Sequence, residues 1–314
     1  MDEQRITILQ GNCIDKIKDL QNNSIDCVVS SPPYFGLRDY GVDGQFGLEK
    51  TYQDYIENTV KVFETFKPKL KDTATIWWNV GDCYSSGSRT STINQSLRGN
   101  TDYGVTRTPV QKNIKEKDLL MIPNRVAIAL QEAGWYIRSE IIWHKPNPMP
   151  ESVTDRPTSC HEKIWLITKN KKYYYDYKSI KEPAKDWGTR ERKKGSAFVD
   201  GTPGRSKQSG GKNCNFAIEG KNKRNVWTVT TKPCREAHFA TFPKDLIEPC
   251  IKAGCPENGT VLDPFGGSGT TGIVAALNNR NAVLIELNQD YIDIANKRID
   301  KELGLFKQTN KGGK

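Results

Sequence analysis

Two short segments of this 314-residue chain combine residue types that could do chemistry. The first is Ser31-Pro32-Pro33-Tyr34, which follows a short buried-strand candidate at residues 25–30. Prolines fix the backbone and have no N–H, so the carbonyls around them are rigid acceptors. Ser31 adds a hydroxyl, and the ring of Tyr34 can stack on a flat base. The segment could therefore accept hydrogen bonds from an exocyclic amino group, or it could be a turn that only closes a strand.

The second segment is rich in glycine and runs from Asp263 to Thr271 as Asp-Pro-Phe-Gly-Gly-Ser-Gly-Thr-Thr. Glycines let a backbone approach a ligand closely, and the helix start that follows offers unpaired N–H groups. The Gly-Lys-Ser/Thr of a phosphate-binding loop is absent, which argues against a nucleoside triphosphate. Glu286 ends the next apolar run, where a carboxylate can accept hydrogen bonds from ribose hydroxyls. Asp263 could meet a cationic amino group, so these parts favour a nucleoside with an ammonium group over a tight turn without ligand.

Both segments need a sheet to bring them together, and the pattern of the chain predicts one. Short apolar runs predict strands at residues 6–9, 25–30, 75–80, 136–143, 163–168, 260–263 and 282–286. Apolar residues at helical spacing predict helices at 14–20, 51–66, 122–133, near 246–253, up to 277 and through 299. Strands that alternate with helices are typical of an α/β fold with a mostly parallel sheet.

The charge of the chain is concentrated in one place. The net charge is +10, and residues 185–232 carry twelve Lys or Arg against four Asp or Glu, which accounts for eight of the ten charges. That segment is also rich in glycine, whereas residues 84–113 are rich in Ser, Thr, Gly and Asn. A local basic excess indicates a polyanionic partner or a solvated loop.

Several classes of protein do not fit the sequence. No apolar run approaches the ~20 residues that span a bilayer, and the start lacks the basic-then-apolar pattern of a secretion signal. The eight cysteines contain no CxxC pair, and the histidines at 144, 161 and 238 are dispersed, so no metal site is expected. We interpret the cysteines as reduced thiols of a cytoplasmic protein without a membrane partner.

Taken together and in this order, the two segments resemble the β group of amino-methylating DNA methyltransferases. Residues 31–34 resemble their catalytic motif, and residues 263–271 resemble their S-adenosylmethionine motif. Residues 135–143 and 161–165 resemble the family's middle strands, and 238–243 resemble its second cofactor segment. The resemblance implies a Rossmann-like S-adenosylmethionine methyltransferase sheet, circularly permuted in sequence, with both sites at the carboxyl ends of adjacent strands.

The resemblance also implies which residues do what. The catalytic residues would be Ser31, Pro32, Pro33 and Tyr34, with Tyr34 stacking on the target base. The cofactor-binding residues would be Asp263, Phe265, Gly267, Ser268, Gly269, Thr270, Thr271, Glu286, Thr241, Phe242 and Asn12. Asn12 departs from the Gly-Asp that the family often has there.

The reaction implied is methyl transfer to the exocyclic amino nitrogen of a flipped base in double-stranded DNA. Serine in the first motif position favours cytosine N4, with adenine N6 as the alternative. More distant alternatives are a catalytically dead nucleic-acid-binding module and an RNA or protein methyltransferase. A cysteine nucleophile is not implied, because Pro33 stands where ring-carbon methylating enzymes have the cysteine of their Pro-Cys pair.

The resemblance divides the chain into a catalytic part (1–180), a basic target-recognition segment (181–235), a cofactor-binding part of the same domain (236–305) and a polar tail (306–314). The candidate DNA contacts are Arg38, Arg190, Arg192, Arg205 and Arg224. Residues 84–113 would be a second DNA contact or a lid. A homodimer and a companion restriction endonuclease are left open.

Overall fold

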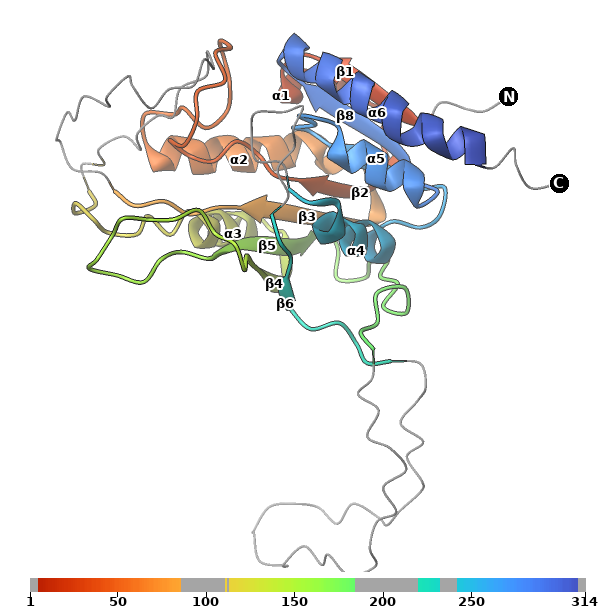
Figure 1. Cartoon of the computed structure of the whole chain (residues 1–314). Helices are drawn as coiled ribbons and strands as arrows, with labels where there is room; N and C mark the ends of the chain where they lie inside the picture. The colour runs from red at the N-terminus through yellow and green to blue at the C-terminus, as the bar shows by residue number, and fades with distance from the viewer. Residues whose placement is uncertain (1–4, 86–110, 112, 184–219, 232–241, 310–314) are drawn as a thin grey trace, which may run out of the picture.

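The computed structural model describes residues 5–85, 111, 113–183, 220–231 and 242–309. Within these residues the strands form one eight-stranded sheet with helices on both faces (Figure 1). The strands are β1 (Ile6–Gln10), β2 (Ile25–Ser30), β3 (Leu70–Val80), β4 (Tyr136–His144), β5 (His161–Thr168), β6 (Val226–Thr228), β7 (Thr260–Asp263) and β8 (Asn281–Glu286). The helices are α1 (Cys13–Lys18), α2 (Tyr52–Phe66), α3 (Ile122–Glu132), α4 (Lys244–Gly254), α5 (Thr270–Leu277) and α6 (Gln289–Thr309), and Lys67–Lys69 form a 3-10 helix.

The order of strands across the sheet is β1-β8-β7-β2-β3-β5-β4-β6. The described pairs are parallel except those that β5 makes with β3 and β4, which confirms the expected mostly parallel α/β sheet. β2 and β7 are neighbours, with Val28 opposite Leu262. Because parallel strands end at the same edge, the two sequence segments meet there, as the resemblance implied.

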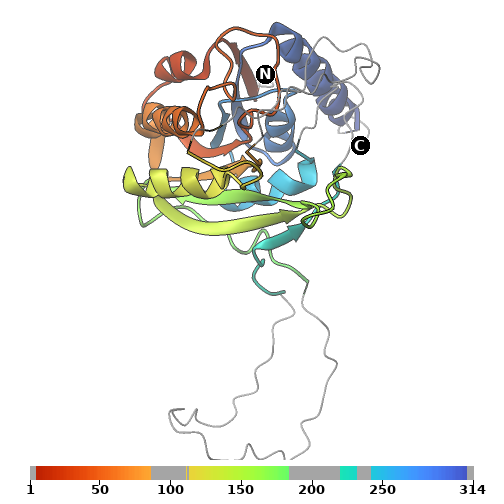
Figure 2. The ribbon, with the colours of Figure 1, turned by 90° about the vertical axis from the view of Figure 1, so that its left-hand side faces the viewer.

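Two consecutive tryptophans on β3 show how the sheet separates two apolar layers. Trp78 packs into the layer formed with α1, α2 and α3, and Trp77 packs into the layer formed with α4, α5 and α6. Figure 2 shows these two groups of helices on opposite sides of the sheet. β2 lies between both layers and is buried along its whole length, which explains why its residues 27–29 are apolar without alternation.

The start of α2 follows directly from its sequence. The Thr51 hydroxyl accepts the Asp54 backbone N–H at 3.1 Å, and the Asp54 carboxylate accepts the Thr51 N–H at 3.2 Å. This reciprocal pair is a capping box, which satisfies N–H groups that the helix cannot pair itself. The helix then buries Tyr55, Phe63 and Phe66 against the sheet.

Two expectations about secondary structure are wrong, one about a loop and one about the end of the last helix. β6 lies inside the segment that was expected to be loop, and it pairs in parallel with β4, with Val226 opposite Ile142. A three-residue edge strand beside charged residues is too short to show an alternating pattern. The last helix continues past Ile299 to Thr309, so the expected polar tail begins inside α6, where Lys, Glu and Leu favour helix.

Parts of two predicted segments lie outside the described residues. These are 86–110 and 112 in the Ser/Thr/Gly/Asn-rich segment, and 184–219 and 232–235 in the basic segment. In the portion of the chain that is described, no helix is both long and apolar enough to cross a bilayer.

Candidate active site

The ends of β2 and β7 are joined by a direct hydrogen bond. The Ser30 hydroxyl donates to Asp263 Oδ1 at 2.6 Å, although the two residues are 233 positions apart in sequence. Both side chains are almost completely buried. The hydrogen bond therefore holds the start of the glycine-rich turn beside the residue that precedes the Ser-Pro-Pro-Tyr turn.

Asp263 organises the glycine-rich turn. Its Oδ1 also accepts the Phe265 N–H at 3.1 Å, and its Oδ2 accepts the Thr271 hydroxyl at 2.6 Å. Burial raises the pKa of Asp263 to about 6, against the hydrogen bonds that lower it. The structure thus gives this carboxyl three protein donors, and its contact with a cationic amino group stays a prediction.

Glu286 and Gly267 form the open side of the same turn. Glu286 Oε2 accepts the Gly267 N–H at 2.8 Å, Oε1 accepts the Asn288 N–H at 2.9 Å, and burial raises the pKa of this carboxyl. Gly267 has φ +50°, and a Cβ built there would meet only the Phe265 carbonyl, at 3.9 Å. Gly269, at φ +80°, is the residue from which α5 starts. A ligand can therefore approach this backbone with a carboxylate beside it.

Ser268 and Thr270 have a partner that sequence reasoning missed. Arg298 of α6 donates through Nη1 to the Ser268 carbonyl and hydroxyl, each at 2.6 Å, and to Thr270 Oγ1 at 3.1 Å. All three residues are buried. From the sequence alone, an arginine in an amphipathic helix looks like an exposed surface residue. The pattern therefore does not indicate that Arg298 is buried and contacts the turn. The hydroxyls fix the turn to α6, and their contact with a cofactor stays a prediction.

The remaining cofactor candidates lie around this turn. Asn12 caps α1 by accepting the Ile14 N–H at 2.9 Å, and the neighbouring Gly11 N–H donates to the Glu286 carbonyl at 2.9 Å. The ring of Phe265 lies 5.3 Å from that of Phe46. Phe242 is half-buried just before α4, and Thr241 lies outside the described residues. The structure thus brings Asn12, Phe265 and Glu286 to one end of the sheet.

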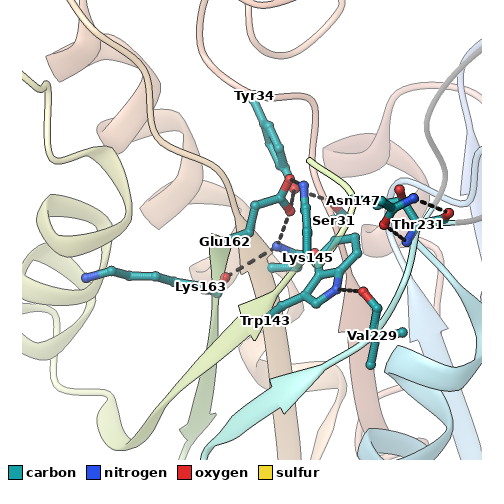
Figure 3. A network of polar contacts seen from close by, with 10 residues as sticks. Ser31, Tyr34, Trp143, Lys145, Asn147, Glu162, Lys163, Val229 and Thr231 are labelled. Carbon is teal, nitrogen blue, oxygen red and sulfur yellow. Dashed lines mark hydrogen bonds and ion pairs between the residues drawn. The ribbon is translucent and has the colours of Figure 1, made fainter. Parts of the chain in front are cut away.

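The Ser-Pro-Pro-Tyr turn, the candidate catalytic turn, is held by hydroxyl groups. The Ser31 hydroxyl donates to Tyr34 Oη at 3.2 Å, and Tyr34 Oη donates to Glu162 Oε2 at 2.6 Å (Figure 3). The Tyr55 hydroxyl donates to the Pro33 carbonyl at 3.1 Å, so that carbonyl already has a partner. Burial and the nearby Glu162 raise the pKa of Tyr34 well above its ordinary value, so Tyr34 stays a donor at neutral pH.

Glu162 connects three strands next to this turn, and its role was not foreseen. The Asn79 side chain of β3 donates to Glu162 Oε2 at 3.0 Å, and the Lys145 ammonium, just after β4, forms an ion pair with Oε1. The side chains of Lys145 and Glu162 are only 19% and 14% exposed. Asn79 follows an apolar stretch of β3, and Glu162 lies in the polar start of β5, so neither sequence context shows that the two side chains meet.

The candidate DNA contacts are placed only in part. Arg38 is half-buried in the loop that follows the catalytic turn. Arg224 is exposed beside β6, and its Nε donates to Glu182 Oε2 at 2.9 Å. Glu182 and Lys221 form an antiparallel bridge at the base of the basic segment. Arg190, Arg192 and Arg205 lie outside the described residues.

Known proteins resemble this chain over most of its length. The family described as DNA methylase, of the N6/N4 type, matches residues 25–297. The type II methyltransferase M.SmaI of Serratia marcescens is 44% identical over 292 residues, which cover 93% of this chain and 90% of that protein. The type II methyltransferase M.Cfr9I of Citrobacter freundii is 43% identical over 296 residues, which cover 94% and 88%.

Two solved structures share the fold. The cytosine-N4-specific PvuII DNA methyltransferase superposes with a TM-score of 0.64 at 16% identity, over 99% of this chain and 94% of that one. A putative DNA modification methylase from Thermus thermophilus, complexed with S-adenosylmethionine, gives 0.58 at 20% identity, over 95% and 96%. The expected Rossmann-like methyltransferase sheet is thereby confirmed.

The residues at the glycine-rich turn fit S-adenosylmethionine. The half-buried Glu286 carboxylate suits ribose hydroxyls, and the open side of Gly267 admits a close ligand. The turn lacks the lysine with which a phosphate-binding loop contacts phosphates. With the family matched over most of its length, the chain belongs to the DNA methylase family, the N6/N4 amino-methylating DNA methyltransferases, whose methyl donor is S-adenosylmethionine.

Proposed function

We propose that this DNA methyltransferase methylates the N4 amino nitrogen of cytosine at a specific sequence in duplex DNA. The observation that carries the proposal is the Ser31 hydroxyl at the end of β2, held beside the glycine-rich turn by the Ser30–Asp263 hydrogen bond. Serine in that motif position favours cytosine over adenine. The PvuII enzyme, which shares the fold, is described as cytosine-N4-specific, and this supports the choice.

The chemistry requires the amino nitrogen to become a better nucleophile. When bound, S-adenosylmethionine supplies an electrophilic methyl group on a sulfonium. Ser31 Oγ and the Pro32 carbonyl would accept the two N–H bonds of the amino group, which favours a tetrahedral nitrogen and stabilises its developing positive charge. Positioning for in-line attack contributes much of the remaining acceleration, so no strong base is needed.

The target base must leave the duplex to reach this turn, at a cost of a few kcal/mol. Residues 181–235 would hold the phosphate backbone through their excess of Lys and Arg, with Arg38 near the base entrance. The chain would then use 1–180 for catalysis and 236–305 for the cofactor. A homodimer, a companion endonuclease and a cytoplasmic location stay predictions from the sequence.

The test is the identity of the methylated nucleoside. Purified enzyme, S-adenosylmethionine and duplex DNA of mixed sequence are incubated, and the DNA is digested and analysed by mass spectrometry. We expect N4-methylcytosine, and N6-methyladenine in its place would refute the cytosine assignment.

A pair of serine variants tests the role of Ser31. Ser31→Ala should bind S-adenosylmethionine with unchanged affinity and lose methyl transfer. Ser24 lies just before β2, at the opposite end of that strand, and among the described residues its hydroxyl donates to the Gln21 carbonyl at 2.7 Å. Ser24→Ala removes that hydroxyl and should keep both properties. Full activity of Ser31→Ala would refute the role given to the hydroxyl.

A further inference from the structure

We propose that Glu162 is a positioning residue that acts through Tyr34 to fix the Ser31 hydroxyl as an acceptor for the amino group of the target base. The inference rests on the proposed role of Ser31 and extends it to a residue outside the catalytic motif. It assigns a function to the polar chain Ser31–Tyr34–Glu162, drawn in Figure 3.

The argument begins with the direction of each hydrogen bond. A hydroxyl can donate or accept, but an ionised carboxylate can only accept. Glu162 therefore requires Tyr34 to donate its proton, across the short 2.6 Å contact. The lone pairs of Tyr34 Oη are then left to accept, and they receive the Ser31 proton at 3.2 Å. Ser31 Oγ, with its own proton committed, can offer only lone pairs to a substrate.

This direction matters because an amino group presents N–H bonds. A freely rotating serine hydroxyl could point its proton at the substrate nitrogen and engage the same lone pair that must attack the methyl group. A serine whose proton is held by Tyr34 cannot do so. The chain thus removes an unproductive orientation before the substrate arrives, which is preorganisation in the electrostatic sense.

The rest of the site engages both oxygens of Glu162 with donors. Lys145 forms an ion pair with one oxygen, and Asn79 donates to the other. Lys145 itself lies over the Trp143 ring, 4.4 Å from its centroid, and Trp143 Nε1 donates to the Val229 carbonyl at 2.8 Å. A buried, charge-assisted arrangement of this kind is costly unless every member is satisfied. Its presence beside the catalytic turn therefore favours a functional reason.

The Tyr34 ring is also fixed from its other side. A Cβ built on Gly81 would lie 2.5 Å from a ring carbon of Tyr34, so the ring rests directly on the backbone after β3. With the ring position set by packing, the hydroxyl alone decides the hydrogen-bond direction. This allows a clean perturbation, because Tyr34→Phe keeps the ring and removes only the hydroxyl.

The experiment compares Tyr34→Phe, Glu162→Gln and the double variant in single-turnover methyl transfer. Tyr34→Phe frees the Ser31 proton, and Glu162→Gln turns a donor toward either Lys145 or Tyr34. We expect each single variant to lose about tenfold in rate, with dissociation constants for S-adenosylmethionine and DNA unchanged. The double variant should be no slower than Tyr34→Phe, because Glu162 acts only through that hydroxyl.

Glu140→Gln is the matched control. Glu140 lies on β4 next to β5 and forms an ion pair with Lys163 at 2.6 Å. Among the described contacts it has none with the side chains of Ser31, Tyr34 or Glu162, so its variant should keep the wild-type rate. Fully additive losses in the double variant, or a loss of affinity that accounts for the lower rate, would overturn the proposal. Equal rates for wild type and Tyr34→Phe would do the same.

A second measurement does not depend on which base is methylated. With ¹³C-labelled tyrosine, the Cζ resonance of Tyr34, assigned by its loss in Tyr34→Phe, should shift in Glu162→Gln at neutral pH and stay in place in Glu140→Gln. An unchanged resonance would refute the hydrogen-bonded chain even in an active enzyme. Failure of the cytosine assignment would instead appear as N6-methyladenine from wild-type enzyme, so the two failures are distinguishable.

Discussion

Asp263, which links the ends of β2 and β7 through its hydrogen bond with Ser30, should give the protein an unusual dependence of stability on pH. Asp263 is buried, and its pKa is raised from 3.8 to about 6. A carboxyl with the higher pKa in the folded chain binds its proton more tightly there than in the unfolded chain. Protonation therefore stabilises the fold, and raising the pH from 4 to 7 removes that stabilisation. The difference between 3.8 and about 6 corresponds to about 3 kcal/mol in the free energy of unfolding.

The variant Asp263→Asn removes this titration while leaving a side chain of similar shape. The free energies of unfolding of wild type and variant are measured by urea titration at pH 4, 5, 6 and 7, with tryptophan fluorescence as the signal. The wild-type value minus the variant value should fall by about 2 kcal/mol between pH 4 and pH 7, which is less than the full difference because the unfolded carboxyl is already partly ionised at pH 4. Other titrating groups cancel in the difference.

Thr271→Val is the matched control for this series. It removes one hydrogen bond to Asp263, the one at 2.6 Å, but keeps the ionisable carboxyl. Its stability should fall with rising pH at least as steeply as that of the wild type, because the lost bond favours the charged form. If the difference between wild type and Asp263→Asn stays constant from pH 4 to pH 7, the reasoning about Asp263 is wrong.

Two further substitutions test the neighbouring contacts. Gly81→Ala would place a Cβ 2.5 Å from the Tyr34 ring, so methyl transfer should fall while binding of S-adenosylmethionine, measured by calorimetry, is retained. Gly304→Ala in α6, with nothing within 4 Å of its Cβ, should leave the rate unchanged. Arg298→Ala leaves the oxygens of Ser268 and Thr270 without their donor, so it should cost at least about 2 kcal/mol of stability and weaken S-adenosylmethionine binding. Loss of the exposed Lys297 side chain should do neither, and equal effects of the two substitutions would contradict the role of Arg298.

The central strands could be predicted because strands that are buried on both faces are rich in apolar residues. Residues 27–29 are apolar without alternation, and β2 occupies residues 25–30 between two helical layers. β6 escaped prediction because its pairing partner, and not its own three residues, makes it a strand. The end of α6 was placed too early because polarity was taken as a sign of fraying, although Lys and Glu are good helix formers.

Only the two turns of the candidate site could be predicted from sequence motifs. The two turns could be matched to their places along the chain, and the sheet brings them together as expected. The contacts of Arg298 and Glu162 depend on tertiary neighbours that lie tens of positions away, and no local pattern encodes them. Sequence motifs thus indicate where the candidate site residues lie. The residues that hold them in position can be identified only from the three-dimensional structure.

The order of the strands interleaves the parts proposed for catalysis and for cofactor binding in one sheet. β7 and β8 come from the carboxyl-terminal part of the chain, yet they lie between β1 and β2 from the amino-terminal part. Without them, β1 would lose its parallel partner and the buried β2 would become an edge. The Ser30–Asp263 hydrogen bond crosses this same boundary, so Ser31 is positioned only when both parts are in place. The site therefore depends on neighbours in the sheet and not on the order in which the two motifs follow each other along the chain.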